Sequence, residues 1–383
     1  MSKKTTTSIS YSSAQKYKTC PEKYFLSKKY KTKLSASALP FGKAVEAGIE
    51  ALFKGVKLED ALDIFRTNWF TEAESKYDKA KQIFDNNTIQ FYFSDYDKNV
   101  FNAEDEALMA EWIAECELDS SKDWQTLFDD LASRYKDESN SLKPNELRFY
   151  NRVLWLSCEI RGQIMLKAFY EKLLPKLTLL EVDGKPASQI PIVLKNEDGD
   201  TIPGYIDFLV KHEDYEEPIV VDVKTSAFFY SEHTLDTSDQ LRTYIAAKGL
   251  EFNTKRGGYI VLIKKLFSKK RCDTCGHFQD GMKKNCAMPN CKGKYSISEV
   301  DANVQFISKE FKDDQLEDVL NDYMNVATAM KNEIRFKNSS NCMQYNKPCE
   351  FYDVCWKRKA AEELEHLELK KQLTTTDESD TTD

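Results

Sequence analysis

Three short stretches of the chain carry residue types suited to metal-assisted hydrolysis. They are Gly204-Tyr205-Ile206-Asp207, Asp222-Val223-Lys224 and Gln240-Leu241-Arg242-Thr243-Tyr244. If the first two stretches lie on neighbouring strands of one hairpin, two carboxylates and an amine meet at one point. Such a group can hold a divalent cation and activate a water molecule against a phosphodiester.

The two aspartates are candidate metal ligands because they interrupt apolar strands. An unpaired carboxylate in such a strand costs several kcal/mol, which a hard cation would offset. Mg²⁺ or Mn²⁺ would take Asp207 and Asp222 as ligands, with the backbone carbonyl of Val223 as a further donor. Lys224 leaves the same strand face as Asp222 and would position or help deprotonate the attacking water. The alternative is a surface ion pair between Asp222 and Lys224 on an edge strand.

The helices and strands that the sequence pattern predicts around these residues indicate an α/β protein. Short β-branched runs between turn-forming segments indicate strands, and apolar residues at helical spacing indicate helices. The expected strands are Gln189–Leu194, Tyr205–Lys211, Ile219–Lys224, Gly258–Lys264 and Val304–Ile307, with hairpin loops at Asn196–Asp200 and His212–Glu217. The expected helices are residues 8–20, started by Ser10 or Ser12, and Phe41–Phe53, Arg161–Lys172, Ser238–Lys248 and Asp313–Phe336.

Length and charge limit the class of protein. At 383 residues and 41% hydrophobic content the chain can bury a sizeable core. No apolar run approaches the roughly 20 residues of a membrane span, and the first residues lack a signal-peptide pattern, so we expect a cytoplasmic protein. The net charge is -8, yet residues 255–294 hold 11 Lys and Arg against 2 acids. That basic stretch could meet phosphates, whereas the acidic residues 101–140 indicate a solvated helical face.

The ten cysteines are the second chemical signal. In a reducing compartment, clustered cysteines indicate metal ligands rather than disulfides. Cys116 and Cys158 stand alone and are expected to be buried small hydrophobes. The other eight form two sets, Cys20 with Cys342, Cys349 and Cys355, and Cys272 with Cys275, Cys286 and Cys291.

The second set has the spacing of a structural zinc site. Cys272-x2-Cys275 followed by Gly276 is typical of a zinc knuckle, and four thiolates complete a tetrahedral Zn²⁺ site, which leaves His277 spare. In the alternative, His277 replaces Cys286 or Cys291 as a ligand. Metal would supply the folding energy of such a small insertion. The lysines around it make a basic lobe, expected beside the active site and suited to phosphate. In the alternative, the ribbon is purely structural and its lysines only keep it soluble.

Together these motifs resemble the PD-(D/E)XK nuclease superfamily, specifically its RecB-like branch, which includes the iron–sulfur nuclease AddB and the CRISPR-associated RecB-like exonucleases. The resemblance covers most of the chain outside residues 55–150 and 268–295. It implies a restriction-endonuclease-like core, a central mixed sheet flanked by helices. Gly204–Asp207 looks like the first acidic motif and Asp222–Lys224 like the D-x-K motif. Gln240 and Tyr244 look like the Q-x3-Y helix, which the resemblance implies contacts DNA near the scissile phosphate.

One helix departs from the family pattern. Phe41-Gly42-Lys43-Ala44-Val45-Glu46 resembles the G-x3-H helix, but Glu46 stands where the family has a metal-binding histidine. A carboxylate can also bind Mg²⁺ or Mn²⁺, so we expect Glu46 to be a third ligand. The alternative is an exposed helix residue without a metal.

The first cysteine set also resembles the iron–sulfur members of this branch. Cys20 lies near the start of the sequence in Tyr17-Lys18-Thr19-Cys20-Pro21, and the other three cysteines lie near its end in Cys342-x6-Cys349-x5-Cys355. The resemblance implies that these four thiolates hold a [4Fe–4S] cluster, although the x6 gap is wider than the expected x2. Zinc bound by the same four cysteines and unligated thiols are the alternatives.

These patterns predict six segments. They are residues 1–54, the N-terminal part of the nuclease domain with the first cluster cysteine and the metal-site helix; 55–155, a helical subdomain; 156–267, the nuclease core; 268–295, a zinc-ribbon insertion; 296–370, with three cluster cysteines; and 371–383, a disordered tail.

The predicted function is that of a metal-dependent exonuclease acting on single-stranded or duplex DNA ends. Recombination, repair or end processing would be its setting, with a helicase or recombination protein as candidate partner and no membrane. A phage origin would put it in the host cytoplasm. The chain has no Walker-type loop and so no helicase motor of its own. The rivals are a catalytically inactive DNA-binding or protein-interaction module with the same fold, and a zinc-ribbon assembly factor.

Overall fold

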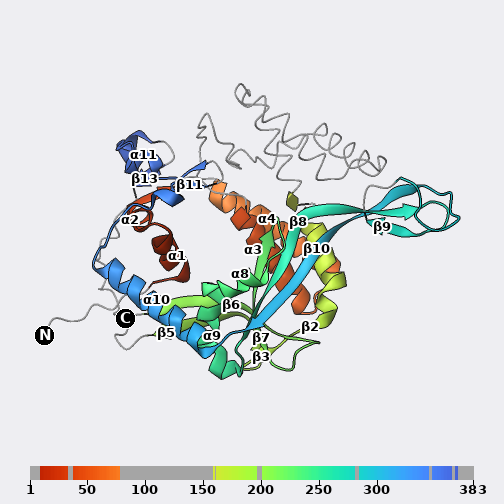
Figure 1. Ribbon diagram of the computed structural model, residues 1–383, viewed down its shortest axis with the longest axis horizontal. Coiled ribbons are helices and arrows are strands. Elements are labelled where there is room, and N and C mark those ends of the chain that lie inside the picture. Colours follow the sequence, from red (N-terminus) through yellow and green to blue (C-terminus); the bar gives the residue numbers. More distant parts are fainter. Residues whose placement is uncertain are drawn as a thin grey trace, which may run out of the picture.

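A computed structural model of the chain describes residues 9–32, 38–77, 158–159, 161–195, 201–280, 284–344, 347–364 and 367–369 (Figure 1). Most of the helical subdomain expected over residues 55–155 lies outside these residues, as do Cys116, the expected loop 196–200 and the tail from residue 371. None of the described helices is long and apolar enough to cross a membrane.

A curled mixed sheet occupies the centre of the molecule (Figure 1). Its strands follow the order β10-β8-β7-β6-β2, with β5 added to β6 and β9 to β8. Only β7 and β8 run parallel; the other pairs are antiparallel. The strands are β2 (Leu177–Leu179), β5 (Ser188–Lys195), β6 (Thr201–His212), β7 (Ile219–Ser226), β8 (Arg256–Cys272), β9 (Phe278–Asp280) and β10 (Tyr295–Glu310). The predicted fold class, a central mixed sheet flanked by helices, is confirmed.

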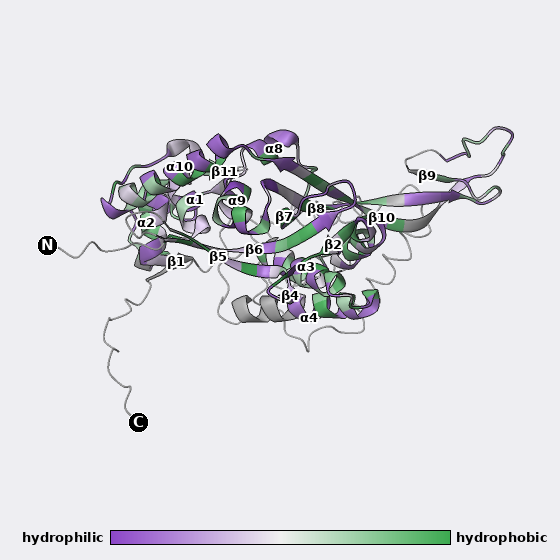
Figure 2. Ribbon diagram, turned by 90° about the horizontal axis from the view of Figure 1, so that it is seen from below, coloured by the Kyte–Doolittle hydropathy of each residue, from purple (hydrophilic) through white to green (hydrophobic). Residues whose placement is uncertain are grey.

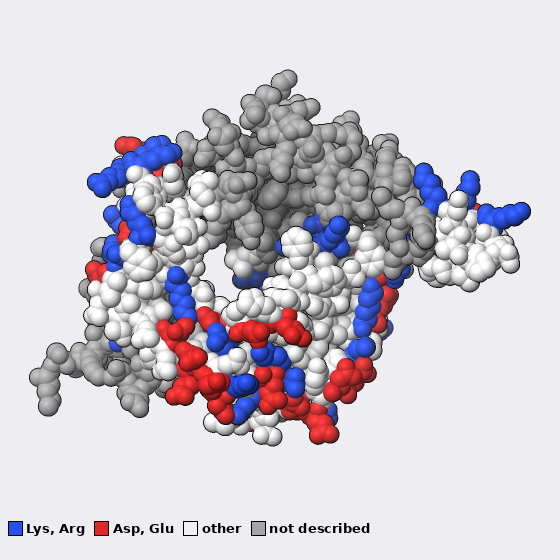
Figure 3. Space-filling view, in the orientation of Figure 1, with Lys and Arg blue, Asp and Glu red and all other residues white. Residues whose placement is uncertain are grey.

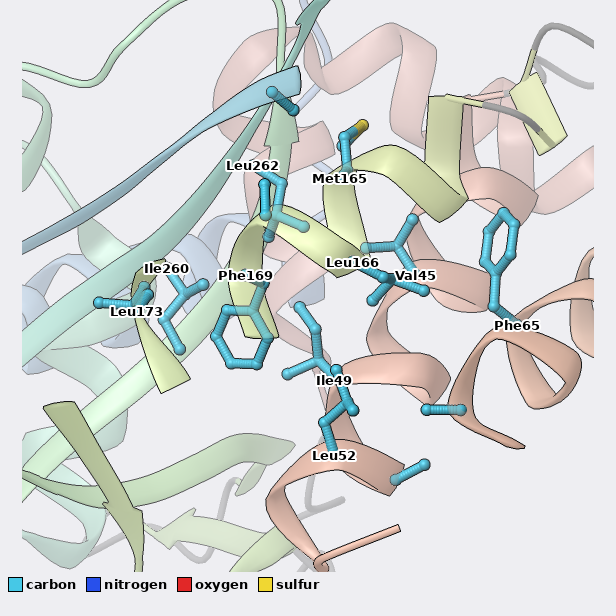
Figure 4. Close-up of a cluster of buried hydrophobic side chains, with 14 of the residues drawn as sticks. Val45, Ile49, Leu52, Phe65, Met165, Leu166, Phe169, Leu173, Ile260 and Leu262 are labelled. Carbon is cyan, nitrogen blue, oxygen red and sulfur yellow. The ribbon is translucent and has the colours of Figure 1, made fainter. Parts of the chain in front are cut away.

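Three helices cover one face of the sheet (Figure 4). They are α3 (Ala38–Phe53), α4 (Leu58–Tyr77) and a helix over residues 161–172. Val45 and Ile49 of α3 pack with Phe169 and with Ile260 and Leu262 of β8. Burial of each such side chain contributes roughly 1.5–3 kcal/mol, so this layer fixes α3 against the sheet.

The opposite face is covered by α8 (Glu232–Asp236), α9 (Asp239–Phe252) and α10 (Asp313–Lys331). Helix α9 begins at Ser238, whose side chain accepts a hydrogen bond from the Leu241 amide, as an N-cap serine does. Leu241 and Ile245 then pack against Val261. This contact sets the position of the Gln240 and Tyr244 side chains on the same helix.

The described segments near the two ends of the chain contact each other. Helices α1 (Tyr11–Thr19) and α2 (Pro21–Lys29) lie beside α10 and α11 (Tyr352–Cys355) (Figure 1). The Tyr17 hydroxyl donates to the Ile334 carbonyl, and the Glu22 amide donates to the Phe336 carbonyl. Strand β1 (Tyr30–Thr32) pairs with β13 (Leu367–Leu369). These contacts bring Cys20 close to the three C-terminal cysteines.

Strands β8 and β10 continue past the sheet as a two-stranded arm that ends in the cysteine-bearing segment (Figure 1). Toward the tip its residues turn hydrophilic (Figure 2). The predicted strands Gly258–Lys264 and Val304–Ile307 were therefore too short, because pairing between the two strands extends to Cys272 and Tyr295. The remaining short strands form two hairpins, β3 (Glu181–Val182) with β4 (Lys185–Pro186) and β11 (Met343–Gln344) with β12 (Lys347–Pro348).

The predicted extension of the last long helix to Phe336 is wrong, since α10 ends at Lys331. Asn332 caps the helix, and Glu333 then adopts a left-handed backbone with φ of 49°. A left-handed residue ends an α-helix because it turns the following amides back toward the last carbonyls. The segment beyond is instead held by the chain's N-terminal helices. By contrast, α1 begins directly after Ser10, whose side chain caps it as predicted.

Helix packing at Gly162 is tight enough to test. A Cβ added at Gly162 would lie 2.1 Å from the fully buried Phe65 ring, whereas one at Gly42 would meet nothing closer than 3.9 Å. We expect Gly162→Ala to lower the free energy of unfolding by about 1–3 kcal/mol through overpacking. Gly42→Ala, the matched helical control, should be neutral or stabilising by up to about 1 kcal/mol. Urea unfolding measures both, and equal effects of the two substitutions would contradict this packing.

Candidate active site and metal centres

The candidate active site lies where β6 and β7 part. These strands pair only through Phe208–Val210 and Ile219–Val221. Asp207 and Asp222 are the first residues beyond the last pair, so they face each other at the fork. Asp207 Oδ2 accepts a hydrogen bond of 2.9 Å from the Val223 amide. The predicted hairpin that brings Asp207 to Asp222 and Lys224 is therefore present.

Asp222 is the centre of a connected set of side chains. Lys224 Nζ lies 2.5 Å from Asp222 Oδ2. The Gln240 amide group donates to Asp222 Oδ1 at 2.6 Å and to the Tyr244 hydroxyl at 2.7 Å. Tyr244 is buried. Gln240 and Tyr244 thus orient Asp222 from α9, and both donor hydrogens of the Gln240 amide are used in doing so.

The Asp222–Lys224 pair is neither exposed nor at an edge. β7 lies between β6 and β8 in the sheet, and Asp222 is 1% exposed. The alternative of a surface ion pair on an edge strand is therefore wrong. A buried pair carries a desolvation cost that the ion pairing repays only in good geometry, so it indicates a functional demand more than a stabilising one.

Helix α3 brings Glu46 to the fork from the other face of the sheet. The Gln189 side chain donates to Glu46 Oε1 at 2.5 Å, and the Ser188 hydroxyl donates to Glu50 Oε1 at 2.7 Å. These contacts join α3 to the first residues of β5. Glu46 is half-buried, so the alternative of an exposed helix residue does not describe it.

Burial and mutual repulsion raise the pKa values of these carboxyl groups, so that ionising all three together is costly. Burial, followed by the Asp222 and Glu46 charges, raises the pKa of Asp207 to about 8. Burial and the Asp222 charge also raise the pKa of Glu46, and burial raises that of Asp222. A divalent cation bound among the three carboxyl groups would stabilise their ionised forms. The donor set therefore fits Mg²⁺ or Mn²⁺, which both prefer oxygen ligands.

The pKa of Lys224 is also raised, and for a lysine this favours the charged form. Burial alone would lower the pKa of Lys224, but the Asp222 carboxylate outweighs it and the net shift is upward. Its ammonium group also lies 6.0 Å from the centre of the Tyr259 ring. Lys224 is therefore held as a cation at this site.

The carboxylates are not yet arranged as a closed metal shell. Among the described residues, only Cys272, Cys275, Cys286 and Cys291 place all their ligand atoms within 4.8 Å of one another. In the fork, Lys224, Gln189 and Gln240 occupy the carboxylate oxygens instead. Cation binding at the fork would replace some of these contacts.

Several residues at the site were missed by the sequence analysis. Tyr259 of β8 pairs in register with Asp222, and its hydroxyl is hydrogen-bonded to Ser238 at 2.5 Å. Tyr230 packs edge-on against the Tyr259 ring. Gln189 was expected only as a strand residue. A tyrosine in an otherwise apolar strand was the available signal for Tyr259; Gln189 offered none, because its role depends on α3.

The cysteines of the arm form a compact group of sulfur atoms. Cys272 Sγ lies 3.6 Å from Cys291 Sγ, and Cys275 Sγ lies 3.5 Å from Cys286 Sγ. Thiolates about 2.3 Å from a tetrahedral zinc ion stand about 3.8 Å apart, so the group fits one ion. Backbone amides of Thr274, Met288 and Gly293 donate to three of the sulfurs. His277 lies outside the group, and its Nδ1 is bonded to the Tyr295 hydroxyl.

The packing around these cysteines leaves no room for a side chain at Gly293. A Cβ there would lie 2.4 Å from Cys272 Sγ and 2.6 Å from both Asp273 Oδ1 and Thr274 Oγ1. The close approach of the Gly293 backbone to Cys272 lets Cys286 and Cys291 lie beside Cys275 and Cys272.

The other four cysteines line one cavity at the junction of the chain ends. Cys20, Cys342, Cys349 and Cys355 all border it, and it encloses about 340 Å³ including space open to solvent. Trp356 Nε1 donates to Cys342 Sγ at 3.1 Å. Unlike the sulfurs of the arm, these four sulfurs do not all lie within 4.8 Å of one another. Cys158, half-buried against the core, belongs to neither set.

Comparison with known proteins agrees with this geometry. A model of the PD-(D/E)XK nuclease superfamily matches residues 8–356, a span that includes the fork and both cysteine sets. The chain therefore belongs to the PD-(D/E)XK nuclease superfamily, whose members generally hydrolyse phosphodiester bonds with divalent metal ions. A search of curated proteins gave no match.

The raised pKa of Asp207 predicts how metal-free protein responds to pH. Folded protein keeps the Asp207 proton up to about pH 8, whereas unfolded chain loses it near pH 4. Unfolding therefore releases a proton between these values, and the free energy of unfolding should fall as pH rises through this window. Metal binding must displace the same proton, so Mn²⁺ affinity should rise up to about tenfold per pH unit below pH 8.

Calorimetric titration and thermal melting across this pH range measure both effects. Asp207→Asn should weaken the pH dependence of melting in metal-free protein, and the raised pKa values of Glu46 and Asp222 should account for what is left. A Mn²⁺ affinity that stays flat between about pH 6 and 8 would contradict the raised pKa.

Proposed function

We propose that this protein is a Mg²⁺- or Mn²⁺-dependent deoxyribonuclease that degrades DNA from its ends. The observation that carries the proposal is the convergence of Asp207, Asp222 and Glu46, from three different elements, beside one cationic lysine. Superfamily membership supports phosphodiester hydrolysis as the reaction. The catalytic metal would be held by these three carboxylates and the Val223 carbonyl, and it would supply a nucleophilic water and stabilise charge on the phosphate.

The side chains of the fork have distinct tasks under this proposal. Lys224, held as a cation, positions the attacking water and offsets charge that develops on the phosphate; its raised pKa makes it a poor base. Gln240 fixes the orientation of Asp222, and Tyr244 supports Gln240 from within the core. Substrate contact by Gln240 and Tyr244 would require Gln240 to release one of its two present bonds.

A pair of exposed phenylalanines supports a preference for strand ends. Phe228 and Phe229 are 79% and 58% exposed and follow the Lys224 strand directly. Their loop is fixed at its far side, where the Gln305 side chain bonds both the amide and the carbonyl of Tyr230. Aromatic rings held in solvent beside a phosphate site are suited to stacking on unpaired bases. Such bases occur at frayed or single-stranded ends.

The two cysteine sets would each hold a structural metal cofactor. We propose Zn²⁺ for Cys272, Cys275, Cys286 and Cys291, and a [4Fe–4S] cluster for Cys20, Cys342, Cys349 and Cys355. The looser sulfur arrangement of the second set supports a cluster over zinc. A cluster there would join the two chain ends covalently and place the protein in the RecB-like iron–sulfur branch. DNA repair, recombination or end processing, with a helicase as partner, is the setting that we propose.

Cleavage of end-labelled linear DNA and of circular DNA tests the activity. Anaerobically purified protein with Mn²⁺ should degrade linear DNA and spare circles. Lys224→Ala should reduce the rate by about 10²-fold or more because it removes a charge that acts in the transition state. Lys211→Ala, an exposed lysine near the other end of β6, is the matched control and should leave the rate unchanged.

Cutting of circles would point to an endonuclease instead. Absence of cleavage with either metal, while DNA binding persists, would favour the inactive DNA-binding module. Equal loss in Lys224→Ala and Lys211→Ala would remove Lys224 from the mechanism.

Metal analysis tests the two cysteine sets separately. Protein purified without oxygen should contain about four iron and four sulfide per chain, together with one zinc. Cys349→Ser should lose the iron and keep the zinc, whereas Cys275→Ser should lose the zinc and keep the iron. Two zinc ions and no sulfide would show that the terminal cysteines hold zinc.

A further inference from the structure

The basic lobe expected beside the active site lies elsewhere. The β8–β10 arm carries the cysteine-bearing ribbon, residues 271–295, away from the fork (Figure 1). Lysine and arginine side chains gather on this ribbon (Figure 3). Its exposed cations are Arg271, Lys284, Lys292 and Lys294. The one exposed acid among its described side chains, Asp273, accepts hydrogen bonds from the Lys294 amide and the Thr274 hydroxyl.

The length of the arm relates the ribbon to the fork. Val261 of β8 pairs with Lys224, and β8 extends from there to Cys272, with two register irregularities in its pairing with β10. At about 3.3 Å per residue the contour length of this stretch is about 36 Å, which is the largest separation that it can span. Base pairs of B-form DNA rise about 3.4 Å each, so the ribbon stands about one helical turn from the fork.

The root of the arm is braced against the body of the protein. Asp301 of β10 is 4% exposed and pairs with Lys172 at 2.6 Å and with Lys269 at 2.5 Å. The Lys172 ammonium also donates to the Ala302 carbonyl. Lys172 belongs to the helix of residues 161–172, so this ion cluster joins the arm to the helical layer under the sheet. The distance from ribbon to fork is therefore set by the fold.

From these observations we propose that the ribbon is a second DNA-binding site, which grips the phosphate backbone of duplex DNA about one helical turn from the scissile phosphate. The inference rests on the proposed nuclease function and specifies its substrate as an end that continues into duplex. A charged ribbon held at a distance of one turn meets the same face of the double helix as the active site does. Phosphate contacts of this kind position a protein without reading sequence.

Binding measured as a function of duplex length tests the site. In a Lys224→Ala background, which slows cleavage, and without added Mn²⁺ or Mg²⁺, affinity should rise steeply as duplexes lengthen from about 8 to about 16 base pairs and then level off. A ribbon variant, Arg271→Gln with Lys284→Gln, Lys292→Gln and Lys294→Gln, should lose that rise. The slope of log affinity against log salt concentration should be smaller in magnitude by about 3 to 4, which is the change expected when four phosphate contacts are lost.

A matched variant controls for the change in net charge. Lys57→Gln, Lys185→Gln, Lys211→Gln and Lys359→Gln removes four exposed cations from the body, and it should keep both the length dependence and the salt dependence. Zinc content and melting temperature must match wild type in both variants. Unchanged affinity and salt dependence in the ribbon variant would overturn the proposal, as would an equal loss in the control variant.

A measurement on wild-type protein does not depend on the variants folding. With Ca²⁺ in place of Mn²⁺, hydroxyl-radical footprinting should show a protected patch about one helical turn inside the duplex from the bound end. Protection confined to the end would overturn the proposal. The cleavage assay tests the nuclease function, and the binding assay tests the ribbon. A protein that cuts no DNA can still be tested for length-dependent binding, so the two failures are distinguishable.

Discussion

The site depends on the cost of placing carboxylates at the fork of β6 and β7. Asp222 is almost fully buried and faces Asp207, and Glu46 adds a third carboxyl group from α3. Lys224 and Gln240 contact the two Asp222 oxygens. Every element near the fork has a task in holding this arrangement. α9 carries Gln240, β8 supplies Tyr259, and β5 supplies Gln189.

The junction of the chain ends is a second organising feature. The Tyr17 and Glu22 hydrogen bonds reach residues 334–336, and β1 pairs with β13. These contacts hold Cys20 beside three cysteines that are more than 300 residues away in the sequence. Closing so long a loop removes much conformational entropy from the unfolded chain, and a bound cofactor at this junction would add to the stability of the whole domain.

Local patterns predicted much of this structure, and long-range contacts account for most of what they missed. The turn-flanked runs around Asp207 and Asp222 predicted the hairpin, and Ser10 and Ser238 marked helix starts through their capping preference. Gln189 and Tyr259 could not be predicted as site residues because their positions depend on packing between distant elements. The length of the arm was missed because its polar residues break the alternation that marks a half-buried strand. Glu333 ended α10 early through a backbone conformation that sequence rarely reveals.

The arm also has a defined place at which it can bend. Its strands are in continuous register except for irregularities between Ile297 and Glu299 and between Ala302 and Val304. Bulges interrupt the ladder and are the most compliant points of a two-stranded ribbon. The inner irregularity directly follows Asp301, so the ion pairs of Asp301 with Lys172 and Lys269 lie at the point where the ladder is interrupted. A force applied at the tip would therefore act on these two ion pairs as well as on the backbone of the arm.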